Sequence, residues 1–179
     1  MIGFLLILIG FGVIVGSYIG IQNISYLKEN VLYYATHFQD SSYNYIFIHF
    51  TFLVFCTITS FIFIGVPLLC TIIFYEGMSI GFLLSIFTAT YSIKGFLYAL
   101  ILIFITKMVY LFILIFIFSK TLLIARKRIG KYLYKTNPNQ LILKLVKGCF
   151  VLTIILLIYD IFLFFYGKNI LQLFQFLLN

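Results

Sequence analysis

The stretch FLYALILIFITKMVYLFILIFIF, residues 96–118, decides the fold class of this chain. It is almost wholly apolar and is long enough to cross a bilayer as one helix, since a hydrocarbon core about 30 Å thick requires about 20 apolar residues. Lys107 stands in its middle. A cation at this depth costs from about 2.5 to over 10 kcal/mol, so it needs a partner, a water-filled cavity or a role. The stretch therefore predicts a membrane helix that carries a buried charge.

The composition of the whole chain excludes a water-soluble globule. Of 179 residues, 64% are hydrophobic and only 9% are charged, which is too little polar surface to cover a domain of this size. The net charge of +8 is concentrated in one stretch without acids, which contains Lys120, Arg126, Lys127, Arg128, Lys131, Lys135, Lys144 and Lys147. Beside membrane helices such a stretch marks the cytoplasmic side, and we do not expect it to bind nucleic acid. Anionic lipid headgroups attract bases, so this loop should lie on the membrane.

Hydropathy predicts an all-α integral membrane protein with about five transmembrane helices in one bundle, a single polytopic domain over residues 1–179. The spans cover residues 2–21, 45–66, 68–91, 96–118 and 141–166. The first lacks the charged start and cleavage site of a secretory signal, so we expect a retained helix. Gly65 and Pro67 mark a turn between the second and third spans, because Pro cannot continue the helical hydrogen-bond ladder.

Counting back from the basic cytoplasmic loop, residues 119–140, places the N-terminus in the cytoplasm and the C-terminus outside. Residues 22–44 then form an outer segment with amphipathic spacing, and residues 168–179 lie along the outer leaflet. The aromatic and apolar positions of the outer segment are candidate partner contacts: Tyr26, Leu27, Tyr34 and Phe38. The abundance of Ile, Phe, Tyr, Lys and Asn points to an AT-rich genome and so to a bacterial cytoplasmic membrane.

Small residues recur at four-residue intervals on two of the predicted spans. They are Gly12, Gly16 and Gly20 in the first span and Gly77 and Gly81 in the third. Such faces let helix backbones approach closely. We expect them to pack helices within one chain in preference to joining copies, although an oligomer stays open.

Glu76 and Asp160 are the acids that lie inside apolar spans and could partner Lys107. Measured from the cytoplasmic side, Glu76 lies about 12 Å deep, Lys107 about 16 Å and Asp160 about 18 Å. A structural ion pair or triad is the favoured interpretation. A proton or ion relay and a contact site for a partner protein are the alternatives.

The sequence contains no arrangement typical of catalysis or cofactor binding. It has no nucleophile elbow, no H-E-x-x-H and no Gly-rich loop followed by Lys and Ser or Thr. His37 and His49 are isolated and the cysteines lack metal-like spacing, so we expect no metal site. The chain is therefore not expected to be an enzyme.

Three elements in order carry a resemblance to a known family: residues 63–69 (FIGVPLL), residues 76–82 (EGMSIGF) and residues 92–96 (SIKGF). This succession resembles the stage II sporulation protein M family, and the resemblance covers most of the chain. It implies a membrane scaffold without enzymatic activity, which holds a lytic transglycosylase and an amidase at the septum. Peptidoglycan is then remodelled while one membrane engulfs the forespore.

The function expected from the sequence is thus a membrane scaffold for cell-wall hydrolases during endospore formation. The main alternative is a membrane subunit of a transport system, in which Glu76, Lys107 and Asp160 would line a path and the basic loop would contact an ATPase. An adjacent sporulation hydrolase gene would favour the first interpretation, and an adjacent ATPase gene the second.

Overall fold

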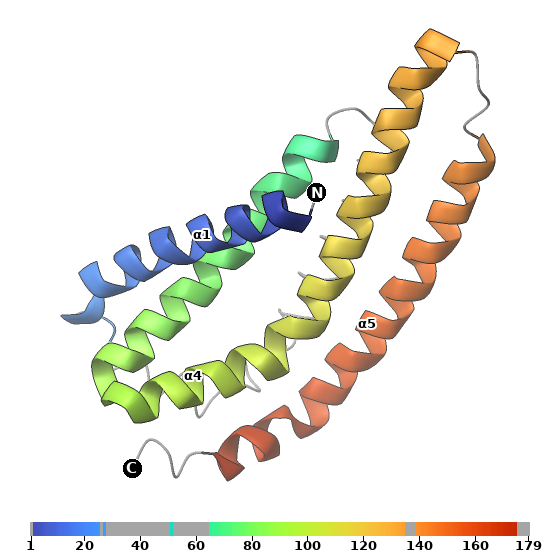
Figure 1. Ribbon diagram of the computed structural model, residues 1–179. Helices are drawn as coiled ribbons and strands as arrows, with labels where there is room; N and C mark the ends of the chain where they lie inside the picture. The colour runs from blue at the N-terminus through green and yellow to red at the C-terminus, as the bar shows by residue number, and fades with distance from the viewer. Residues whose placement is uncertain (1, 26, 28–50, 52–64, 135–138, 175–179) are drawn as a thin grey trace.

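The computed structural model describes residues 2–25, 27, 51, 65–134 and 139–174, and these form three long helices without strands (Figure 1). They are α1 (Ile2–Gln22), α4 (Gly65–Tyr134) and α5 (Asn139–Leu173). Each contains a stretch long and apolar enough to span a membrane: Gly3–Gln22, Val66–Leu122 and Phe150–Gly167. The expected all-α class is confirmed for this part of the chain.

Helix α4 folds back on itself at Ser92. A straight helix over Val66–Leu122 would be about 85 Å long, far more than a bilayer core of about 30 Å. Ser92 has φ 55° and ψ −135°, close to the first central position of a type II′ turn, and no other residue of α4 leaves the helical region. Residues 65–91, the first arm, therefore run antiparallel to residues 93–134, the second arm (Figure 1).

The predicted third and fourth spans thus become the two arms of one folded helix. Their connection is tighter than the loop expected at residues 92–95, because Ser92 alone leaves the helical conformation. Gly95 makes this possible: a Cβ there would collide with the carbonyl oxygen of Phe87 on the first arm. The rings of Phe87 and Tyr98 pack across the arms next to the turn, with centroids 5.3 Å apart.

Helix α1 crosses the first arm of α4 in a parallel direction, and both helices start at the same end of the molecule (Figure 1). Their backbones nearly touch. A Cβ placed on Gly77 would lie 2.6 Å from the carbonyl oxygen of Ile9, and the hydroxyl of Ser17 donates a hydrogen bond to the carbonyl of Gly81 at 3.2 Å. Glycine is required at this crossing because any side chain would separate the two helices.

Helix α5 runs along the second arm of α4 and contacts it through a narrow stripe of buried residues. Its buried positions are Leu156, Asp160, Leu163 and Gly167, which recur at spacings of four, three and four. This spacing is that of one seam along a helix. Large apolar side chains on the other faces are exposed, Phe165 and Ile158 at 63% each, as lipid contact requires.

Buried apolar side chains form two clusters. The first core cluster joins Leu5, Leu69, Ile72, Ile73, Tyr110, Ile113, Leu114, Ile117, Phe118 and Leu156. The second core cluster, nearer the turn at Ser92, joins Ile86, Phe87, Tyr98, Ala99 and Leu102. Both are built mainly from the two arms of α4, which is therefore the centre of the fold.

One sequence-based expectation needs correcting. The basic segment, residues 119–140, was expected to be a loop, but it is helical over most of its length, because α4 continues to Tyr134 and α5 begins at Asn139. Leu, Ala, Arg and Lys are good helix formers, so the helix does not stop where the apolar stretch ends. Residues 168–173 belong to α5, and the location of residues 168–179 along the outer leaflet stays a prediction.

Candidate functional site

The candidate site is a buried charged layer built around Lys107 and Glu76. Glu76 lies 16 residues before Ser92 and Lys107 lies 15 residues after it, so the fold-back of α4 brings them to the same level. The Lys107 ammonium donates to the Glu76 carboxylate at 2.6 Å, and the side chains are only 5% and 11% exposed. At this distance and burial the two groups form a charge-assisted hydrogen bond.

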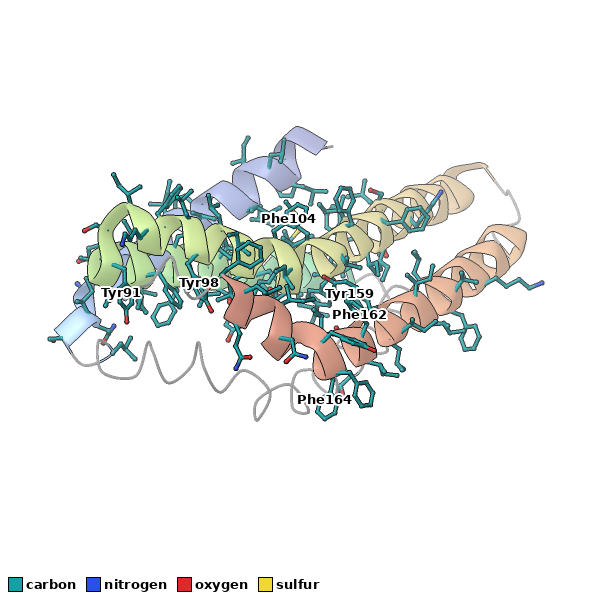
Figure 2. The ribbon with its side chains drawn as sticks, turned by 90° about the horizontal axis from the view of Figure 1, so that it is seen from below. Tyr91, Tyr98, Phe104, Tyr159, Phe162 and Phe164 are labelled. Carbon is teal, nitrogen blue, oxygen red and sulfur yellow. The ribbon has the colours of Figure 1, made fainter. Side chains whose placement is uncertain are left out.

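Asp160 adds a second carboxylate to the level of this pair. It is 6% exposed, and it lies on the stripe of α5 that packs against the second arm. Its neighbour Tyr159 donates a hydrogen bond from its hydroxyl to the carbonyl of Ile105, two residues before Lys107. Figure 2 shows Tyr159 on the side of α5 toward α4, with Phe164 pointing away. Three segments, from both arms and α5, thus bring their polar groups to one layer.

The charged layer lies between the two core clusters. On the first arm, Glu76 lies between Ile73 of the first core cluster and Ile86 of the second. On the second arm, Lys107 lies between Tyr110 of the first core cluster and Leu102 of the second. The side chain nearest in sequence, Thr106, is buried and donates to the carbonyl of Leu102 at 2.8 Å within its own helix. Two hydroxyl-bearing side chains of the second arm are also buried in these clusters, Tyr110 in the first and Tyr98 in the second.

The chemistry available to this layer is electrostatic. A salt bridge in a low-dielectric setting barely repays the desolvation of its two ions, but loss of one partner leaves an uncompensated buried charge. The pair therefore fixes the register of the two arms. Within the described ranges no group of three His, Cys, Asp or Glu side chains is placed to hold a metal ion.

The predicted helix-packing glycines meet in the structure. Gly12 and Gly16 face Gly77 and Met78 of the first arm, Gly20 faces Ser85, and Gly81 faces Val13. The predicted turn residues Gly65 and Pro67 lie in the first helical turn of α4, where Pro is tolerated because its missing N–H has no helical partner.

Of the predicted partner contacts, Leu27 packs half-buried against the second core cluster. Tyr26, Tyr34 and Phe38 lie beyond the part of the chain that the structure describes.

Two tyrosines of the bundle were not anticipated from the sequence. Tyr159 joins α5 to Ile105, and its place directly before a buried acid was the available signal. Tyr98 is fully buried, and its hydroxyl has no hydrogen-bond partner among the residues that the structure describes. Nothing in the sequence distinguished Tyr98 from its apolar neighbours.

A shallow apolar groove of about 490 Å³ lies along the second arm. It is lined by Leu100, Ile101, Ile103, Phe104, Ile105, Met108 and Phe174, the last from the end of α5. Its lining offers no polar side chain to orient a ligand, so the charged layer remains the candidate site.

Comparison with known proteins gives no relative for this chain: no family model, no curated protein and no solved structure matches it.

Proposed function

We propose that this protein is a membrane scaffold without enzymatic activity, which holds cell-wall hydrolases, a lytic transglycosylase and an amidase, during endospore formation. The observation that supports it best is the Glu76–Lys107 ion pair sealed between two apolar clusters. Its charges satisfy each other and hold two helical arms in one register. A scaffold needs such a fixed shape and no reacting groups.

The elements that carry the resemblance to the stage II sporulation protein M family have structural uses in this chain. Gly65 and Pro67 start α4, Gly77 and Gly81 receive α1, and Gly95 permits the fold-back of α4. The resemblance therefore concerns the packing of a bundle. The hydrolase-binding role comes from the family resemblance, and the rigid bundle is compatible with it.

The proposed topology has five spans. Because α1 runs parallel to the first arm of α4, the chain between Gln22 and Gly65 has to return to the end where α1 starts. The apolar residues 45–66 are available for that return. With the basic segment in the cytoplasm of a bacterial cell, the N-terminus is inside, and the turn at Ser92 and the end of α5 are outside.

The alternative, a transport subunit with a charged path, has less support. A path needs polar groups in succession, whereas the two core clusters around the ion pair consist mostly of aliphatic and phenylalanine side chains, with Tyr98 and Tyr110 as their hydroxyl-bearing members.

The scaffold proposal is tested by co-purification of the tagged protein with the lytic transglycosylase and the amidase from sporulating host cells. Replacing Tyr26, Leu27, Tyr34 and Phe38 by Ser is expected to leave the protein inserted but to remove the hydrolases and stall engulfment. Replacing Phe4, Ile7, Phe11 and Ile14, which are exposed on α1, by Leu serves as the control. Unchanged co-purification and normal engulfment at equal expression would refute the role of the outer segment.

A further inference from the structure

The apolar groove on the second arm of α4 is bounded on one side by the end of α5. Phe174, which directly follows α5, forms that wall, and the other lining residues lie between Leu100 and Met108. Figure 1 shows the end of α5 beside this part of α4. At a rise of about 1.5 Å per residue the groove extends about 12 Å along the helix. A lining of apolar side chains suits an acyl chain, which is elongated and has no polar group that needs a hydrogen-bond partner.

A lysine nearer the turn lies on the same face of the second arm as part of the groove lining. Residues of this face recur at spacings of three, four, three and four: Lys94, Leu97, Ile101, Phe104 and Met108. Such spacing places side chains above one another along a helix. The last three of them line the groove, and Lys94 lies about 9 Å before Leu100 along the axis. One exposed ammonium therefore stands in line with the groove.

Lys94 has no acidic partner among the residues that the structure describes. The acids in those ranges are Glu76 and Asp160, and both are buried in the charged layer. Lys94 itself is exposed and lies two residues after Ser92. In the proposed topology this turn lies at the membrane surface, where basic residues attract anionic lipid headgroups. The anion most available to Lys94 is therefore a lipid phosphate.

The distances along the second arm match the dimensions of one lipid leaflet. Measured from Lys94, the groove runs from about 9 Å at Leu100 to about 21 Å at Met108. A headgroup layer is about 5 to 8 Å thick and the hydrocarbon of one leaflet about 15 Å, so acyl chains occupy about this interval below their phosphate. We propose that the groove binds an acyl chain of an anionic phospholipid whose phosphate pairs with Lys94. This site goes beyond the proposed scaffold role, since it requires no hydrolase.

The test uses tryptophan fluorescence, because the chain contains no Trp of its own. Phe104→Trp places a reporter in the groove, and Phe11→Trp places a matched control on α1, a helix without bases; the two phenylalanines are 65% and 61% exposed. The full chain with either reporter is reconstituted in nanodiscs of phosphatidylcholine that contain increasing fractions of brominated phosphatidylglycerol or brominated phosphatidylcholine. Both lipids carry bromine at the same acyl position, so they differ only in the headgroup.

Brominated phosphatidylglycerol is expected to quench the groove reporter with an apparent affinity about fivefold higher than that of brominated phosphatidylcholine, as one basic residue near anionic lipid would give. The α1 reporter should respond equally to both lipids. Lys94→Gln should abolish the preference of the groove reporter, whereas Lys120→Gln, which removes the same charge at another exposed position of α4, should leave it intact. An ionic strength of about 1 M should also weaken the preference, because the Debye length then falls to about 3 Å.

Four results would overturn the lipid site. Equal quenching of the groove reporter by both lipids would show ordinary lipid contact, and a preference at both reporters would show general attraction to a chain with a net charge of +8. A preference that survives Lys94→Gln would place the phosphate elsewhere. A groove reporter that neither lipid quenches would show that protein, either another part of this chain or a second copy, covers the groove. Because no hydrolase is present, failure of the lipid site is distinguishable from failure of the scaffold role.

Discussion

At the scale of single residues, one backbone conformation and one ion pair determine how α4 is folded. Ser92 has a positive φ, which residues other than Gly rarely adopt, and it has it at the point where the chain must reverse. The Glu76–Lys107 pair then fixes which residues of the two arms face each other. A strained turn is tolerated because the contacts between the arms over-determine it.

The backbone strain at Ser92 predicts a stabilising substitution. Ser92→Gly should raise the free energy of unfolding by about 1 kcal/mol, since Gly adopts positive φ without a steric cost, and Ser92→Val should lower it. Thermal unfolding of the detergent-solubilised protein measures both. Ser119→Gly, in the regular part of α4, is the control and should be destabilising by about 0.5 to 1 kcal/mol. Equal effects of the two glycine variants would contradict a strained turn.

The buried ion pair predicts non-additive losses. Lys107→Met or Glu76→Gln alone should cost about 3 to 5 kcal/mol, because each removes one member of the buried Glu76–Lys107 pair and leaves the other in an apolar setting. The double variant should recover part of this loss. Folded yield and thermal stability in detergent provide the measurement, with Lys94→Met at the exposed turn as the control. Strictly additive losses in the double variant would show that the two side chains do not depend on each other.

At the scale of helices, α1 and α5 are attached to α4 in different ways. Backbone contact through glycines holds α1, whereas α5 meets the second arm through one stripe of side chains and the hydroxyl of Tyr159. Close backbone contact tolerates no added atoms, but a seam of side chains can adjust. The two interfaces should therefore respond differently to small substitutions.

Adding one methyl group to α1 tests this difference. Gly16→Ala should destabilise the protein by about 1 to 3 kcal/mol, since the new Cβ would overlap the backbone of Met78. The matched control is Gly10→Ala in the same helix, which meets nothing within 4 Å and should be neutral or slightly stabilising. Thermal unfolding and protease resistance distinguish them. If both variants behave alike, α1 does not pack on α4 through this face.

At the scale of the whole molecule, the helices have two distinct ends. The turn at Ser92 and the end of α5 lie at one end, and the end of α4 and the start of α5 lie at the other (Figure 1). Because the sequence around this second end is rich in bases, the positive-inside rule predicts that it is cytoplasmic.

Cysteine labelling in intact cells tests this orientation. After the native cysteines are replaced, Ile93→Cys, which is exposed at the turn, should react with a membrane-impermeant maleimide, and Arg128→Cys should react only after the cells are opened. Reaction of Arg128→Cys in intact cells, or of both positions equally, would reverse or refute the proposed topology.

The sequence by itself predicted that the protein is all-α and that its long apolar segments lie in lipid. Apolar runs near 20 residues and a charged content of 9% leave only a helical membrane protein, because backbone groups in lipid must be satisfied within each segment. The sequence also placed Glu76, Lys107 and Asp160 at one depth, since helical rise converts residue number directly into height. The packing faces of Gly12, Gly16, Gly77 and Gly81 followed from a four-residue repeat.

Only the tertiary structure decided which of these residues meet. The depth of each residue in the membrane could not show whether Glu76 or Asp160 lies nearer to Lys107. The rotation of each helix about its axis decides this, and that rotation is set by packing and not by hydropathy. The fold-back at Ser92 brings the Glu76 carboxylate to 2.6 Å from the Lys107 ammonium. The continuation of α4 past Phe118 was missed for a related reason: a hydropathy pattern ends with the apolar side chains, whereas a helix ends only where its backbone hydrogen bonds end.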